Sequence, residues 1–289
     1  MAHMSKVRLG GYGLPVGSDD PVAFARAHRD FGYSAAYVPA TLTADDSAAL
    51  AAFAKAFADA DVLLAEIGIW RSLVPRDAAQ RKANLAYAAD KLAVADALGA
   101  GCAVTYIGSL DETAHARPVA ANFTDEAFDA AVETARYLID LVKPTRTKFA
   151  LEMMQNSLPD SIESYVRLIK AIDRPAFAAH LDPVNIIMTP RSYWDNAALI
   201  RACFDALGDH IVSCHAKDIR LSDDAAVHLD EVQIGEGVLD YGTYLTQLAR
   251  LSRDVPLMLE HLPDDAYPLA RDRVFAAGDA AGVGFVHRD

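Results

Sequence analysis

Short apolar runs alternate with longer amphipathic segments along the whole chain, and this alternation restricts the fold more than any other feature. The apolar runs are continuous, without the in/out alternation of a half-exposed strand, which is typical of strands buried on both faces of a parallel sheet. We predict eight such strands, at residues 7–10, 35–38, 62–67, 102–106, 148–152, 177–182, 211–215 and 257–260.

A helical pattern follows each predicted strand. The clearest start comes after Pro159, where Ser161 is a capping residue ahead of Glu163 and an apolar face. The longest helix, at 78–98, runs into Gly99 and Gly101, and glycine commonly ends a helix. The other helices are predicted at residues 21–31, 46–60, 125–142, 196–207, 241–251 and 266–277.

Eight strands that each lead into a helix predict an α/β fold, a (β/α)8 TIM barrel that forms a single domain over residues 4–289. The length of 289 residues suits this fold, since such barrels typically need about 250. A doubly wound sheet is the alternative, but Gly10, Gly11 and Gly13 do not match the G-x-G-x-x-G phosphate loop of that fold. Residues 1–3 are expected to be a cloning remnant.

Charge and cysteine content disfavour several classes of protein. The chain has 27 basic and 40 acidic residues, a net charge of −13, which disfavours nucleic acid as a partner. No apolar run approaches the ~20 residues of a transmembrane helix, so no membrane association is expected. Three widely spaced cysteines form no disulfide framework, and with no signal peptide visible we expect a cytoplasmic protein.

Four consecutive predicted strands end on a metal-ligating residue type. The strands at 148–152, 177–182, 211–215 and 257–260 end on Glu152, Asp182, His215 and Glu260. The carboxyl ends of barrel strands lie on one face, so these side chains should meet at the rim of an apolar core. Three carboxylates there would repel one another unless a cation neutralises them. We therefore predict one divalent ion, with Mn²⁺ ahead of Mg²⁺, Co²⁺ or Zn²⁺, rather than ion pairs with Lys or Arg.

The sequences around these four residues, LEMMQN, HLDPVN, SCHAKD and LMLEHL, resemble the strand ends of the xylose-isomerase-like TIM-barrel family. This family includes sugar phosphate isomerases and epimerases and AP-endonuclease family 2. The resemblance implies that Glu152, Asp182, His215 and Glu260 bind one metal, and that the two glutamates exchange protons with a sugar.

Two departures from the ketose epimerases concern substrate anchoring. Those enzymes place a histidine three residues after the strand-six aspartate, where this chain has Asn185, and an arginine six residues after the strand-seven histidine, where it has Leu221. The endonucleases of the family need further zinc-binding histidines that this chain lacks, so nuclease activity is disfavoured.

Further candidate residues lie on the same predicted face. We expect Glu66, Trp70, Asn185 and Lys217 to contact substrate, with Trp70 stacking on a sugar ring or simply covering the barrel mouth. His115, in a polar loop, is a candidate catalytic residue or a solvated histidine. His180 is expected to be a core histidine or to support the metal ligands. The segment 228–237 is expected to be a lid that pivots at Gly235 and Gly237.

The leading functional hypothesis is a metal-dependent sugar isomerase or epimerase that removes a proton next to a carbonyl and forms an enediolate, without nicotinamide. The alternative is a lyase that cleaves 3-keto glycosides by β-elimination. The segments EIGIW, KPTRTKFALE and HLDEV resemble that branch, which includes the α subunits of C-glycoside deglycosidases. A small-molecule sugar or keto-glycoside is the expected partner, and a homo-oligomer or a β-rich partner subunit stays open.

Overall fold

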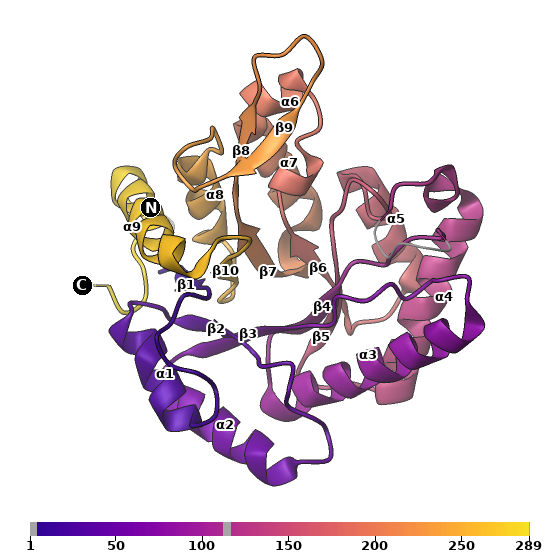
Figure 1. Ribbon diagram of the computed structural model, residues 1–289, viewed down its shortest axis with the longest axis horizontal. Helices are drawn as coiled ribbons and strands as arrows, with labels where there is room; N and C mark the ends of the chain where they lie inside the picture. Colours follow the sequence, from indigo (N-terminus) through magenta and orange to yellow (C-terminus); the bar gives the residue numbers. More distant parts are fainter. Residues whose placement is uncertain (1–4, 112–116, 289) are drawn as a thin grey trace. The chain divides into compact units, whose positions relative to one another are not determined.

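The computed structural model describes residues 5–111 and 117–288. All eight predicted strands are present, and none of their ends differs by more than one residue from the prediction (Figure 1). They are β1 (Arg8–Gly10), β2 (Ala35–Tyr37), β3 (Leu63–Gly68), β4 (Cys102–Thr105), β5 (Lys148–Glu152), β6 (Phe177–Leu181), β7 (Ile211–Ala216) and β10 (Pro256–Leu259).

The order of the main sheet is β1-β10-β7-β6-β5-β4-β3-β2, so each strand lies beside its neighbour in sequence and the first lies beside the last. The backbone N–H of Ser34, just before β2, also donates a hydrogen bond of 2.8 Å to the carbonyl of Leu9 in β1. Parallel strands in this order, with helices between them, form a nearly closed (β/α)8 barrel, as the sequence predicted.

Helices lie between the strands at positions close to those predicted. They are α1 (Pro21–Asp30), α2 (Ser47–Asp59), α3 (Ala78–Leu98), α4 (Asp125–Val142), α5 (Ile162–Ile172), α6 (Pro190–Trp194), α7 (Asn196–Leu207), α8 (Tyr241–Leu248) and α9 (Tyr267–Ala281). The short helix α6 was not anticipated, and α9 extends four residues beyond its predicted end. Among the described residues, no helix is long and apolar enough to cross a membrane.

The chain divides into two compact units, each made of separate segments. The first unit comprises residues 1–37, 56–63 and 181–289 and contains β1, β2, β7 and β10. In it β10 pairs in parallel with β1 and with β7, and Met258 lies opposite His215. Its core is formed by fully buried aromatic and aliphatic side chains, among them Leu9, Tyr33, Tyr244, Tyr267 and Phe285.

The second unit comprises residues 38–55 and 64–180. Parallel pairing runs from β3 to β4, from β4 to β5 and from β5 to β6. The last pairing sets Glu152 opposite His180. Tyr165 of α5 is fully buried behind these strands, and its hydroxyl donates a hydrogen bond to the carbonyl of Leu151.

The helix ends in the second unit follow from local sequence. Ser161 accepts a hydrogen bond from the backbone N–H of Ser164 at 3.2 Å, and Ser164 accepts one from the backbone of Ser161 at 3.1 Å. A capped start was predicted at Ser161, and the structure adds that the cap is reciprocal and that its partner is Ser164. Helix α3 ends at Gly99, whose φ of +70° is easily reached only by glycine.

One element of the first unit was not predicted. The strands β8 (Asp218–Leu221) and β9 (Leu229–Val232) form an antiparallel hairpin after β7, where the sequence suggested a long loop. The hairpin is drawn in orange in Figure 1, and its loop extends away from β7 and β10. Its strands are short and partly exposed, so they lack the continuous apolar runs that identified the barrel strands.

The cap at Ser161 supports a first testable prediction. Ser161→Ala removes the acceptor for the Ser164 N–H and should lower the free energy of unfolding by about 1 kcal/mol. Chemical denaturation monitored by circular dichroism measures this change. Ser252→Ala, at an exposed serine outside any helix, should change stability by less than about 0.5 kcal/mol. Equal effects of the two substitutions would show that the cap contributes nothing.

Candidate metal and catalytic site

Three of the four predicted metal ligands lie together in the first unit. Asp182 directly follows β6, His215 belongs to β7, and Glu260 directly follows β10. Their side chains are buried, and one donor atom of each lies within 4.8 Å of those of the other two. The Nδ1 atom of His215 lies 2.9 Å from Oε1 of Glu260 and 3.8 Å from Oδ2 of Asp182.

Lys217, two residues after His215, supplies a positive charge to this cluster. Its Nζ atom lies 2.9 Å from Oδ2 of Asp182 and 2.7 Å from Oε1 of Glu260, and the residue is only 4% exposed. Burial raises the pKa of Glu260, but His215 and Lys217 lower it more, so that it lies well below its ordinary value. Glu260 is therefore ionised, and the two buried carboxylates depend on neighbouring cations.

The donor set fits a divalent cation. Two carboxylates and one imidazole suit hard or borderline ions such as Mn²⁺, Mg²⁺ or Zn²⁺. The Lys217 ammonium lies within ion-pair distance of both carboxylates, which shows that this site favours positive charge. Asn185 also contacts this group, since its Oδ1 atom lies 3.4 Å from Nζ of Lys217.

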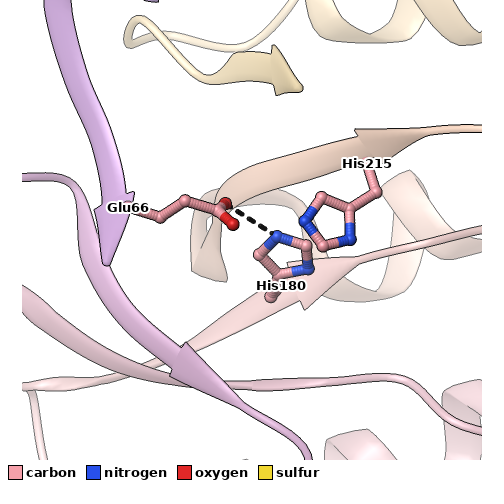
Figure 2. A group of neighbouring side chains, drawn as sticks. All are labelled: Glu66, His180 and His215. Atoms are coloured by element: carbon pink, nitrogen blue, oxygen red, sulfur yellow. Dashed lines mark hydrogen bonds and ion pairs between the residues drawn. The ribbon is translucent and has the colours of Figure 1, made fainter. Parts of the chain in front are cut away.

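Other predicted residues lie in the second unit, among them Glu152 and Glu66. Glu152 is the last residue of β5 and is 4% exposed. Glu66 of β3 is completely buried, and its carboxylate lies 2.9 Å from Nε2 of His180 (Figure 2). His180 is also completely buried, as expected of a core histidine. The carboxylate of Glu66 thus already has an internal partner, and its expected contact with substrate stays a prediction.

Trp70 occupies an unusual backbone conformation in the same unit. Its φ is +44°, a strained value for a large side chain, and its indole ring is stacked near Tyr106 with ring centroids 6.3 Å apart. Trp70 is 39% exposed, so part of its side chain is open to solvent. Its expected stacking on a sugar is untested. His115 lies outside the described residues.

An aromatic pair was missed by the sequence analysis. Tyr12, after β1, stacks on Tyr37 of β2 with ring centroids 4.3 Å apart and an interplanar angle of 11°. The Tyr37 hydroxyl donates a hydrogen bond to the carbonyl of Leu259, the residue before Glu260. The signal was the position of each tyrosine at or just after a strand end, the same criterion that predicted the candidate metal ligands.

A second missed pair borders Glu260. The Nδ1 atom of His261 lies 2.9 Å from Oε2 of Glu231, which comes from β9, and Oε1 of Glu231 lies 3.5 Å from Lys217. The hydrogen bond to Glu231 raises the pKa of His261 above its ordinary value, against the effect of burial. Burial raises the pKa of Glu231, but His261 and Lys217 lower it overall. The β8–β9 hairpin thus contributes a charged residue to the edge of the site.

Asp218 fixes this hairpin in place. Its buried carboxylate accepts hydrogen bonds of 2.8–3.1 Å from four backbone N–H groups, those of Ile219, Gly235, Gly237 and Leu239. A Cβ atom on Gly237 would lie 2.3 Å from Oδ1 of Asp218, so glycine is needed there for close packing. Gly235 has a φ of +84°. The two glycines expected to be pivots therefore lie in a segment held by a buried anchor.

The family model of the xylose isomerase-like TIM barrel matches residues 25–278, which is most of the chain. The chain belongs to this family. No curated protein matches it at a significant level.

Solved structures of the same fold cover nearly the whole chain. A 3-keto-D-glucoside 4-epimerase from E. coli is 14% identical with a TM-score of 0.71, over 95% of this chain and 100% of that one. A D-psicose 3-epimerase is 15% identical with a TM-score of 0.69, over 96% and 100%. A Mycobacterium smegmatis xylose isomerase-like protein in complex with magnesium is 20% identical with a TM-score of 0.65, over 97% and 98%. At these identities the likeness concerns the fold.

The anchor at Asp218 gives a second prediction. Asp218→Asn replaces an acceptor oxygen with an NH2 group that faces backbone N–H donors, and should lower the free energy of unfolding by about 2–3 kcal/mol. It should also speed proteolysis within residues 222–240, because the segment loses its anchor. Asp230→Asn, at an exposed carboxylate on the same hairpin, is the matched control and should change neither measurement. Unchanged proteolysis in the Asp218 variant would contradict the anchoring role.

Proposed function

We propose that the chain is a divalent-metal-dependent sugar isomerase or epimerase that moves a proton next to a carbonyl group through an enediolate. The observation that carries the proposal is the buried cluster of Asp182, His215 and Glu260. Membership of a family whose solved structures include two sugar epimerases supports it. Isomerisation and epimerisation leave the oxidation level of the sugar unchanged, so the reaction needs no added nicotinamide.

Asp182, His215 and Glu260 would hold the ion, and the sequence pattern adds Glu152 as the fourth ligand. A bound divalent cation supplies polarisation of the substrate carbonyl, which acidifies the neighbouring C–H group. We propose Mn²⁺ first, and the magnesium complex of the M. smegmatis neighbour supports a hard divalent ion.

The two glutamates are proposed to exchange the proton with the sugar. Glu260 is ionised because its pKa is lowered, so it can accept a proton, although a low pKa also makes it a weak base. Glu152 would return a proton on the other side of the substrate. Lys217 lies 2.7 Å from Glu260 and would donate a hydrogen bond to a substrate oxygen. Glu66, Trp70 and Asn185 are proposed to contact substrate, and His115 is kept as a candidate catalytic residue.

A lyase is the second candidate, favoured by Asn185, which replaces the histidine of the ketose epimerases. The first step is the same removal of a proton next to the carbonyl. In elimination, the C–H electron pair forms a C=C bond while the C–O bond at the β carbon breaks. The leaving oxygen keeps the C–O electron pair and takes up a proton. A 3-keto glycoside has such a C–O bond, because its glycosidic oxygen is attached to the carbon β to the keto group. One solved structure of the same fold is named a 3-keto-D-glucoside 4-epimerase.

The third prediction concerns metal content. After purification in the presence of Mn²⁺ and removal of free ion, the protein should retain about one divalent ion per chain, measured by elemental mass spectrometry. His215→Ala should lower the affinity for the divalent ion. The loss should exceed the ~10–100-fold that is typical when a residue that only hydrogen-bonds a metal ligand is replaced. His210→Ala, at an exposed histidine just before β7, should leave the affinity unchanged.

Two results would contradict the metal proposal. One is an equal metal content in the His215 variant, the His210 variant and the unaltered protein. The other is a protein that binds no divalent ion at millimolar concentration while a crystal structure shows Lys217 bridging Asp182 and Glu260. The cluster would then be a structural ion-pair network.

The fourth prediction concerns the proton acceptors. Glu260→Gln and Glu152→Gln each retain a ligand oxygen but lose the base, so turnover should fall by ~10²–10⁴. The measurement is deuterium incorporation from D₂O, followed by NMR, across a panel of ketoses and 3-keto glycosides. Glu133→Gln, at an exposed position in α4, is the control and should exchange normally. Near-normal exchange in both active-site variants, with loss in His115→Ala, would instead make the loop histidine the base.

A further inference from the structure

A cavity in the first unit opens directly beside the candidate catalytic carboxylate. It has a volume of about 350 Å³ and lies between the β9 strand and the segment that links β10 to α9. Lys217 and Glu260 form part of its wall, so a molecule bound at these two residues can extend into it. Its size is within the usual range for small-ligand sites, ~300–1,000 Å³.

The wall of the cavity has a charged part and a part that is mostly apolar. Near Lys217 and Glu260 the cavity is bordered by the hydrogen-bonded pair of Glu231 and His261. His261 has a φ of +57°, a strained value that is more often found where a loop shapes a binding site. The remaining wall comprises five apolar residues, Val232, Leu262, Pro263, Ala266 and Leu269, together with the polar Gln233 and Asp265.

Leu269 is the clearest sign that this wall receives a ligand. It is a large apolar side chain in the first turn of α9, yet it is 48% exposed and lines a hollow instead of packing in the core. Every carbon of a free sugar carries an oxygen that needs a hydrogen-bond partner, so an apolar wall suits such a molecule poorly. A group without hydroxyls would gain free energy by leaving water at this position.

The charges around the cavity constrain the ligand further. Glu231, Glu260 and Asp265 line it. Among the described lining residues Lys217 is the single Lys or Arg, and it already lies within ion-pair distance of three carboxylates, those of Asp182, Glu231 and Glu260. Lys217 and His261 already pair with carboxylates of the protein, so a phosphate or carboxylate against the apolar part of the wall would lose its hydration without gaining a positively charged partner among the described lining residues. The bound group should therefore be uncharged as well as apolar.

We infer that this cavity is the subsite for an uncharged, apolar aglycone, and that the substrate is a glycoside whose keto sugar lies at Glu260. The inference rests on the proposed function for the position of the sugar. It selects keto glycosides over free ketoses and over sugar phosphates, whichever of epimerisation or elimination follows. Leu269 and Ala266 are then specificity-determining residues that contact the aglycone and take no part in the proton transfer.

Binding of unoxidised glucosides tests the subsite without turnover, because these probes have no keto group to react. Phenyl β-glucoside and methyl β-glucoside share the sugar and differ in the aglycone. Isothermal titration calorimetry on the full chain with Mn²⁺ should show tighter binding of the phenyl compound. The 4-carboxyphenyl glucoside, of similar shape but charged, should bind more weakly than the phenyl compound.

Two variants locate the effect. Leu269→Ser should weaken binding of phenyl glucoside by about tenfold and leave methyl glucoside unchanged, as expected for loss of a few carbons from an apolar pocket. Leu141→Ser, at a similarly exposed leucine of α4, should change neither. Ala266→Phe fills the cavity and should exclude the phenyl compound alone. Since Leu269 is half-exposed, its replacement is expected to leave the fold intact, which circular dichroism verifies.

The outcomes separate this inference from the proposed function. If phenyl and methyl glucoside bind equally, or if Leu269→Ser and Leu141→Ser behave alike, the subsite inference is wrong even where deuterium exchange on ketoses succeeds. If phenyl glucoside binds through Leu269 while no sugar of the panel exchanges deuterium, the subsite stands and the proposed reaction fails.

Discussion

The site depends on the electrostatic requirement of two buried carboxylates. Asp182 and Glu260 lie close to each other where the strands end, and both are buried, so an ionised pair there is costly unless positive charge lies nearby. Lys217 and His215 lie beside the two carboxylates, and the Nζ atom of Lys217 is within 3 Å of both. Because the two carboxylates need positive charge nearby, the cluster also suits a divalent ion. Such an ion carries a larger charge than the Lys217 ammonium and binds several oxygen ligands.

The β8–β9 hairpin extends this electrostatic network outward. Asp218 directly follows Lys217 in sequence, and its four backbone hydrogen bonds fix the segment that carries the hairpin back to the barrel. The hairpin then brings Glu231 to His261 and to Lys217. A buried anchor therefore holds one wall of the proposed aglycone subsite, so the shape of the cavity is part of the fold and does not require a ligand to form it.

The candidate metal ligands could be predicted from the sequence because each prediction depends on a local pattern. Glu152, Asp182, His215 and Glu260 each follow an apolar run, and a parallel barrel places all such ends on one face. Tyr12 and Tyr37 satisfy the same criterion. Tyrosine is common in protein cores, however, so its position at a strand end does not by itself indicate a functional site. The contact of Glu66 with substrate stays a prediction from its strand end, whereas its pairing with His180 joins residues 114 positions apart and could not be predicted from local pattern.

The sequence by itself determined the succession of eight strands and helices, the capped start of α5 and the residue types at the strand ends. These features depend on periodicity and on interactions within a few residues, which a single chain displays directly. Only the tertiary structure decided that Lys217 lies between Asp182 and Glu260, that Asp218 anchors the hairpin, and that Leu269 lines a cavity beside Glu260. Those contacts bring together residues of separate elements, and their energies depend on burial and distance, quantities that exist only after the chain has folded.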